Sequence, residues 1–207
     1  MSVFVKICGI TSEADARVAV DAGADAVGFM FHQGSPRFVT PELVEQVIAA
    51  LPARVAKVGV FVNVPPDMVR AVAARCGLDT LQFHGDESPG YCGQFAPLTV
   101  WKAIAVKDRE SLSRLPPYEI DAWLLDAHVP GQRGGTGAMF NWDLAVDAKS
   151  LGRPILLAGG LTPANVADAV RHVQPWGVDV SSGVESAPGR KDHAKLRAFI
   201  QAARAAA

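Results

Sequence analysis

Cys8 and Asp126 are the side chains in this sequence best suited to moving protons. Each stands at the end of a short apolar run, residues 4–8 in one case and 122–126 in the other. A thiolate can act as a general base and a carboxyl group as a general acid, provided that both reach the same substrate. Taken alone, a buried cysteine is more often an inert core residue, and an aspartate after a strand often caps a loop. Their pairing makes them our candidate catalytic acid and base.

Two glycine-rich segments that also follow apolar runs have the composition of a phosphate site. One contains Gly159 and Gly160, and the other contains Ser181, Ser182 and Gly183. Glycine lets the backbone approach a ligand closely, and amide groups at a helix start can hold a phosphate without a charged side chain. Each segment alone is also consistent with an ordinary turn. Together they indicate a phosphate site.

Arg37 and a third glycine cluster are further candidates. The guanidinium of Arg37 matches the geometry of a carboxylate, although a loop arginine is equally consistent with a solvated side chain. The third cluster includes Gly135, Thr136 and Gly137 and follows Asp126. Its length and composition suggest a mobile flap or another wall of the site.

Three charged residues are predicted to point into the core. Lys6, Lys102 and Asp179 lie within or at the end of apolar runs, and buried charges are normally paired. We therefore expect a paired charge network. Because side chains alternate along a strand, Lys6 shares a face with Cys8 and is placed to lower the pKa of the thiol.

His32, His84 and His128 each follow an apolar run, so a metal site must be considered. The carboxylate partners that would complete such a site are sparse beside them. We therefore expect no metal. His84, with Gln82 two residues before it, is instead expected to line a pocket.

The sequence repeats one pattern eight times: a short apolar run, a loop and a segment with helical spacing. Thr40 before Pro41 and Thr162 before Pro163 have the composition of helix starts. The predicted strands are residues 4–8, 26–31, 58–62, 80–84, 100–104, 122–126, 154–158 and 178–181. The predicted helices are residues 13–22, 41–51, 66–75, 89–95, 110–115, 144–151, 163–173 and 194–205.

Regular alternation of strands and helices predicts an α/β fold with parallel strands. Eight units favour a compact (β/α)8 TIM barrel that forms one domain over residues 1–207. An open, doubly wound sheet is the alternative, but the glycines near residue 159 lack the GxGxxG spacing of dinucleotide-binding folds. In such barrels catalytic groups gather at the carboxyl ends of the strands, and the last two loops often hold phosphate. The candidate residues fall at these ends.

Composition narrows the classes of partner. Lys and Arg number 20 and Asp and Glu 21, so the net charge of −1 gives no chain-wide attraction for nucleic acid or an anionic membrane. Three cysteines without close spacing argue against a disulfide framework or a structural zinc site. The sequence shows no signal peptide pattern and no apolar run of membrane-spanning length. These features favour a cytoplasmic protein that acts on a small molecule. They leave open whether it is a monomer or a homodimer.

Seven ordered motifs resemble those of phosphoribosylanthranilate isomerases and cover nearly the whole chain. They are KICGIT at residues 6–11, SPR at 35–37, QFHG at 82–85, LD at 125–126, GGTG at 134–137, GGL at 159–161 and DVSSGVE at 179–185. Two positions depart from the family pattern. Ala138 stands where a longer polar or basic residue is frequent, and Asn141 where Asp is usual.

The resemblance implies a cofactor-independent isomerase of aromatic amino-acid biosynthesis, in the tryptophan branch. Its reaction would be the Amadori rearrangement of N-(5-phosphoribosyl)anthranilate to 1-(2-carboxyphenylamino)-1-deoxyribulose 5-phosphate. The resemblance implies that Cys8 is the general base, that Asp126 is the general acid and that Arg37 lies near the anthranilate carboxylate. It also implies that the phosphate of this phosphosugar binds at the ends of the last two strands.

Two other functions fit the same architecture, since barrels host many chemistries. A pentose-phosphate epimerase would use a divalent metal held by the histidines and aspartates at the barrel mouth. A barrel without activity would bind phosphosugars in a regulatory or assembly role. The sequence also leaves open whether a related aminoaldose is accepted.

Overall fold

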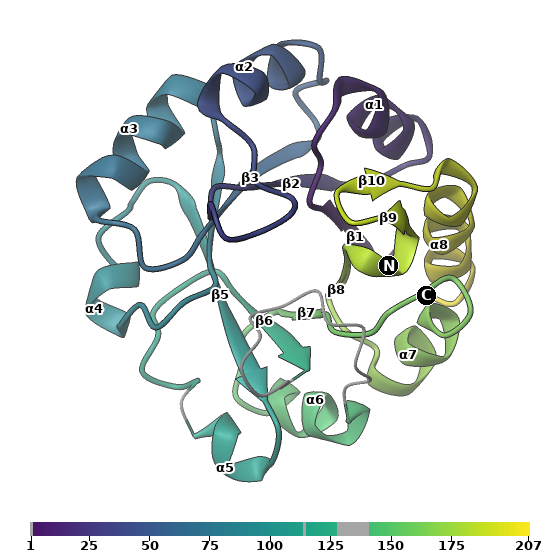
Figure 1. Cartoon of the computed structure of the whole chain (residues 1–207). Coiled ribbons are helices and arrows are strands. Elements are labelled where there is room, and N and C mark those ends of the chain that lie inside the picture. The colour runs from purple at the N-terminus through teal and green to yellow at the C-terminus, as the bar shows by residue number, and fades with distance from the viewer. Residues whose placement is uncertain (1, 114, 128–140) are drawn as a thin grey trace.

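The computed structural model describes residues 2–113, 115–127 and 141–207 and confirms the predicted barrel. Eight parallel strands close into a ring in chain order, with the helices around them (Figure 1). The strands of the ring are β1 (Phe4–Cys8), β2 (Ala26–Met30), β3 (Ala56–Phe61), β4 (Thr80–Phe83), β5 (Thr99–Val106), β6 (Ala122–Ala127), β7 (Ile155–Leu157) and β8 (Gly177–Val180). The helices are α1 (Glu13–Asp21), α2 (Pro41–Ala49), α3 (Pro66–Cys76), α4 (Pro89–Cys92), α5 (Arg109–Leu112), α6 (Trp142–Lys149), α7 (Val166–Val173) and α8 (His193–Ala205).

The inside of the ring is apolar over part of its circumference and charged where the ring closes. The apolar cluster consists of Ala26, Val58, Trp101, Ala103, Ala122, Leu124, Leu156 and Ala158. Strands β1 and β8 pair in a register that sets Lys6 opposite Asp179, and Lys6 Nζ lies 2.8 Å from Asp179 Oδ1. This register confirms the predicted inward orientation of Lys6 and places an ion pair across the closure of the barrel.

A second apolar layer lies between the strands and the helices. Ile7 and Leu125 belong to this outer cluster, whereas their neighbours Cys8 and Asp126 line a cavity at the barrel mouth. Because side chains alternate across a strand, one residue of register decides which group reaches the mouth. The predicted alternation is therefore confirmed at both candidate catalytic positions.

The structure confirms one predicted helix start and contradicts another. Thr40 caps α2, since its side chain accepts a hydrogen bond from the amide of Leu43, and Pro41 occupies the first turn. The prediction of a helix start at Pro163 is wrong, because α7 begins at Val166 with Asn165 as its N-cap residue. Helices α4 and α5 are also shorter than predicted. None of the described helices has the length and hydropathy needed to cross a membrane.

A short 3₁₀ turn and a β-hairpin after β8 were not predicted. The turn is η1 (Ser182–Val184), and the hairpin pairs β9 (Glu185–Ala187) with β10 (Arg190–Lys191). In Figure 1 the hairpin lies between α8 and the centre of the ring, beside β1. The carbonyl oxygen of Gly189 accepts a hydrogen bond from the Thr11 hydroxyl, which ties the hairpin to the loop after β1.

Candidate active site

A cavity of about 600 Å³ opens at the carboxyl ends of the strands. Most of the residues predicted from the sequence line it, namely Cys8, Arg37, Gln82, His84, Asp126, Gly159, Gly160, Ser181, Ser182 and Gly183. Cys8 and Asp126 therefore face one cavity from β1 and β6. The third glycine cluster, with Gly135, Thr136 and Gly137, lies outside the described residues.

Cys8 is buried beside a charged pair. Burial raises the pKa of its thiol, the ammonium of Lys6 acts in the opposite direction, and the carboxylate of Asp179 adds to the rise. The contribution of Lys6 has the expected direction, but the net effect is a raised thiol pKa. Lys6 does favour the thiolate, but burial outweighs its contribution.

Lys6 keeps its positive charge although its side chain is fully buried. Burial lowers its pKa, but the carboxylate of Asp179 and the nearby Cys8 outweigh this, and the net pKa is raised. Gly28 on β2 makes room for this cluster, because a Cβ there would lie 2.8 Å from Cys8 Sγ and 3.2 Å from Lys6 Cε. The protein thus places a permanent cation beside the candidate base.

Asp126 lies near His84, the residue that follows β4. Its Oδ2 lies 3.4 Å from Nε2 of His84, and Nδ1 of His84 lies 3.1 Å from Nε2 of Gln82. Gln82 and His84 therefore both lie in the pocket, as predicted. The candidate acid has a polar partner that is itself held in place.

Arg37 is anchored by a residue that the sequence analysis did not single out. Its Nε and Nη2 each donate a 2.8 Å hydrogen bond to Glu185 at the start of β9. Lys191 on β10 donates to the same carboxylate at 2.9 Å and to the carbonyl of Ser181 at 3.1 Å. Burial raises the pKa of Glu185, but Arg37 and Lys191 more than offset it and hold that pKa below its usual range.

The glycine-rich ends of β7 and β8 meet closely. A Cβ on Gly183 would lie 1.9 Å from the carbonyl oxygen of Leu161, so only glycine permits this approach. Gly160 has a φ of 66°, and its carbonyl accepts a hydrogen bond of 2.9 Å from the side chain of Asn165. The hydroxyl of Ser181 is buried and has no protein partner among the described residues. The backbone therefore forms this wall of the cavity.

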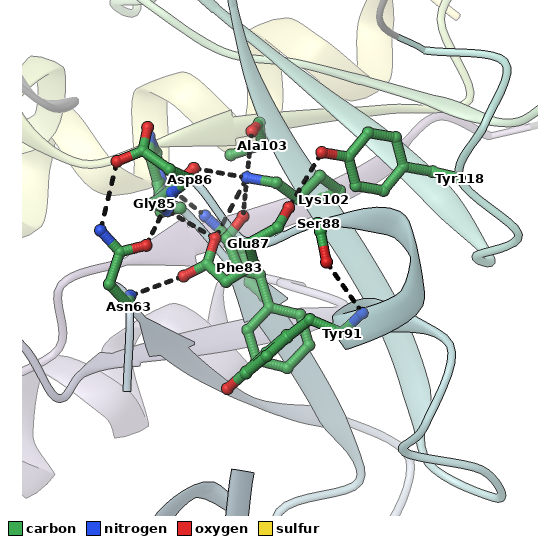
Figure 2. A network of polar contacts seen from close by, with 12 residues as sticks. Asn63, Phe83, Gly85, Asp86, Glu87, Ser88, Tyr91, Lys102, Ala103 and Tyr118 are labelled. Carbon is green, nitrogen blue, oxygen red and sulfur yellow. Dashed lines mark hydrogen bonds and ion pairs between the residues drawn. The ribbon is translucent and has the colours of Figure 1, made fainter. Parts of the chain in front are cut away.

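Lys102 belongs to a separate network rather than to the Lys6 pair. Its Nζ lies 3.2 Å from Glu87 Oε2 and donates to the carbonyls of Phe83 and Gly85, at 3.3 and 2.7 Å (Figure 2). Glu87 in turn accepts from the amides of Asn63 and Gly85. The buried charges are paired as expected, but they form two separate networks instead of one. Lys6 pairs with Asp179, and Lys102 pairs with Glu87.

The histidines do not form a metal site within the part of the chain that the structure describes, where no cluster of ligating side chains occurs. His32 and His84 line the cavity, and His128 lies outside the described residues.

Asn141 caps α6, since its side chain accepts a hydrogen bond from the amide of Asp143. An aspartate at position 141 would cap the helix in the same way. The presence of Asn141 where the family usually has Asp therefore preserves the N-cap of α6. Ala138 lies outside the described residues.

Comparison with known proteins gives a consistent result along the chain. The family model for N-(5'-phosphoribosyl)anthranilate (PRA) isomerase matches residues 5–202. The N-(5'-phosphoribosyl)anthranilate isomerase of Geobacter sulfurreducens is 56% identical over 202 residues, which are 98% of each chain, and that of Geobacter metallireducens is 55% identical over 98% of this chain and 100% of the relative.

Solved structures agree with the sequence relatives. The phosphoribosyl anthranilate isomerase of Thermotoga maritima superposes with a TM-score of 0.93 at 41% identity, covering 98% of this chain and 99% of that one. A phosphoribosyl anthranilate isomerase in complex with reduced 1-(o-carboxyphenylamino)-1-deoxyribulose 5-phosphate gives 0.90 at 40% identity, with the same coverage. Fold, site and sequence thus agree, and the chain belongs to the N-(5'-phosphoribosyl)anthranilate isomerase family.

Proposed function

We propose that this protein converts N-(5'-phosphoribosyl)anthranilate to 1-(2-carboxyphenylamino)-1-deoxyribulose 5-phosphate in tryptophan biosynthesis, without a cofactor. One observation carries the proposal: Cys8 and Asp126 line one cavity together with Arg37 and the glycine-rich ends of β7 and β8. An acid, a base and places for two anions are what this isomerisation requires. The solved complex of a relative with the reduced product supports the substrate class.

The substrate carries an anion at each end, and the cavity offers a place for each. The phosphate binds at Gly159, Gly160, Ser181, Ser182 and Gly183, which line the cavity. The anthranilate carboxylate binds Arg37, which has five N–H donors and gives two of them to Glu185. Fixing both ends holds the ribose between the acid and the base and reduces the entropic cost of reaching the transition state.

Asp126 starts the reaction as the acid. It gives its proton to the ring oxygen of the ribose, the bond between that oxygen and C1' breaks, and the bonding pair stays on the oxygen. The nitrogen lone pair then forms a C=N bond to C1', which gives an iminium. Asp126 is left as a carboxylate.

Cys8 acts next as the base. Its thiolate removes the proton from C2', the C–H pair forms a C1'=C2' double bond, and the C=N pair returns to nitrogen. The enolamine then gains a proton at C1' and loses one from the C2' hydroxyl, which gives the ketone. Before the next turnover Cys8 loses a proton and Asp126 regains one.

Because the thiol pKa of Cys8 is raised, another group must favour its thiolate for the base step to occur. The base must ionise although burial favours the neutral thiol. Lys6 supplies a fixed positive charge beside it, and the iminium adds a second one once the ring has opened. Both charges favour the thiolate at the step that uses it.

The test uses the fluorescence of the anthranilate group, which is lost on conversion. Purified protein added to N-(5'-phosphoribosyl)anthranilate is expected to remove this fluorescence at a rate proportional to protein concentration, equally with and without a chelator. Absence of turnover, with phosphosugar binding retained, would identify a binding protein. Turnover that a chelator abolishes would contradict the cofactor-independent mechanism.

The same proposal covers location and assembly. The protein acts in the cytoplasm on a small phosphosugar, as a monomer or homodimer, without nucleic acid or membrane. Its net charge of −1 supports this, because such a chain holds anions by local groups rather than by a basic surface. The Thermotoga maritima relative is described as dimeric.

A further inference from the structure

A line of three polar side chains runs from β4 to the candidate acid. Nε2 of Gln82 lies 3.1 Å from Nδ1 of His84, and Nε2 of His84 lies 3.4 Å from Oδ2 of Asp126. Gln82 is buried, the other two retain slight exposure, and all three line the cavity. Each nitrogen of the imidazole therefore has one assigned neighbour.

The amide of Gln82 has an orientation that fixes the hydrogen on His84. Its NH₂ group faces Nδ1, so Nδ1 must accept, and the neutral ring carries its hydrogen on Nε2. Oε1 of Gln82 is buried without a protein partner among the described residues. If the amide of Gln82 were rotated by 180°, its NH₂ group, with two N–H donors, would occupy the position without a partner. The observed orientation leaves only one acceptor oxygen there, so it leaves fewer buried polar groups unsatisfied.

The backbone around His84 is held by the buried network in Figure 2. Lys102 Nζ donates to the carbonyl of Phe83, which precedes the histidine, and to that of Gly85, which follows it. Glu87 accepts from the amide of Gly85 at 2.8 Å. The residue is thus held at its backbone and at Nδ1, and Nε2 lies 3.4 Å from Oδ2 of Asp126.

We infer that Gln82 is a positioning residue for the acid step, because it fixes the His84 tautomer that carries its hydrogen on Nε2, the nitrogen that lies 3.4 Å from Asp126 Oδ2. When Asp126 gives its proton to the ring oxygen, the electron pair of that O–H bond stays on the carboxylate. The Nε2–H of His84 then stabilises this carboxylate through a hydrogen bond to Oδ2. The other tautomer would present a lone pair to the same oxygen and repel it.

This inference rests on the proposed function for its catalytic consequence, but the tautomer can be measured independently. Protein with ¹⁵N-labelled histidine distinguishes protonated from unprotonated ring nitrogens, and a His84→Gln variant identifies the His84 signals among those of the five histidines. In the native protein we expect a protonated Nε2 and an unprotonated Nδ1. A protonated Nδ1 with an unprotonated Nε2 would overturn the inference whether or not the protein turns over the substrate.

Two substitutions of similar size test the role of the amide. Gln82→Glu replaces the donor by an acceptor, so the ¹⁵N signals of His84 are expected to change to those of a protonated Nδ1. Gln82→Met removes the hydrogen bond. Both variants are expected to lower kcat by about 10- to 100-fold, as for other partners that fix a histidine tautomer, with KM within about threefold. Gln94→Glu, in the exposed turn after α4, is the matched control and should change neither value.

The two readouts separate positioning from a purely structural role. A structural role predicts that the variants lower the unfolding temperature and change KM, while the His84 tautomer stays the same. Retention of the native tautomer in Gln82→Glu, or of native kcat in folded Gln82→Met, contradicts the inference. Absence of turnover in the native protein contradicts the proposed function instead, and the ¹⁵N measurement still decides the tautomer.

Discussion

Glu185 binds the guanidinium of Arg37 through two parallel hydrogen bonds of 2.8 Å, although 148 residues separate them. The pair joins the loop after β2 to the hairpin after β8, and Lys191 holds the carboxylate from its other side. Two-point pairing of this kind fixes both the position and the plane of the guanidinium. Arg37 is therefore oriented before substrate arrives.

Glu185→Gln removes the charge that orients Arg37. Hydrogen bonds to charged groups contribute about 1.5–3 kcal/mol, and about 1.4 kcal/mol is tenfold in an equilibrium constant. We expect KM to rise at least about tenfold, with a smaller change in kcat, because binding rather than proton transfer is affected. Steady-state kinetics measure both. Glu13→Gln, at an exposed position of α1, is the control, and an unchanged KM in Glu185→Gln contradicts the role of the pair.

The two charges beside Cys8 are expected to shift the pH profile in opposite directions. Activity requires the thiolate, so kcat/KM rises with pH through the pKa of Cys8. Lys6 lowers that pKa and Asp179 raises it. Lys6→Met should therefore move the acid limb to higher pH, and Asp179→Asn should move it to lower pH. Shifts in the same direction, or none, would show that the limb belongs to another group.

A side chain at position 183 is expected to destabilise the fold and disturb the cavity. Its Cβ would meet the carbonyl of Leu161 at 1.9 Å, so Gly183→Ala must separate the ends of β7 and β8. Overpacking of this kind costs about 1–3 kcal/mol. We expect lower stability by that amount and weaker binding of inorganic phosphate, measured by thermal unfolding and calorimetry. Gly93→Ala is the control, because its Cβ would have an ordinary 3.6 Å contact. Equal phosphate affinity in both variants would count against a phosphate site at Gly183.

Lys102→Met leaves Glu87 buried without its cation. Breaking a buried ion pair typically costs about 3–5 kcal/mol. The free energy of unfolding in urea should fall by that amount. The exposed Lys107→Met should change it by less than about 0.5 kcal/mol. A loss below about 1 kcal/mol in Lys102→Met would show that the Figure 2 network does not stabilise the fold.

The alternating strands and helices of the barrel could be predicted because apolar residues recur along the sequence with strand and helix periodicity. Alternation placed Cys8 and Asp126 inward, and Thr40 caps α2 as expected. Thr162 misled because its own amide donates to the Asn165 side chain in a turn, and the helix starts later. Local composition does not distinguish this turn from a first helical turn.

The supporting residues of the site could not be predicted, since their partners are distant in the chain. Lys191 and Glu185 pair within a short hairpin that lacks a periodic pattern, and Arg37 joins them from the second loop. The net pKa of Cys8 likewise depends on burial, which sequence position does not reveal. The glutamate did fall within a recognisable motif, DVSSGVE, but Lys191 carried no signal.

The most direct test of the acid–base assignment is kcat at saturating N-(5'-phosphoribosyl)anthranilate in Cys8→Ala and Asp126→Asn. Loss of a general acid or base typically costs 10²- to 10⁴-fold, so we expect each kcat to fall by about that factor with the unfolding temperature preserved. Cys76→Ala, at a buried cysteine on α3, and Asp143→Asn, at an exposed position of α6, should retain native kcat. A folded Cys8→Ala or Asp126→Asn with more than about a third of native kcat would contradict the account.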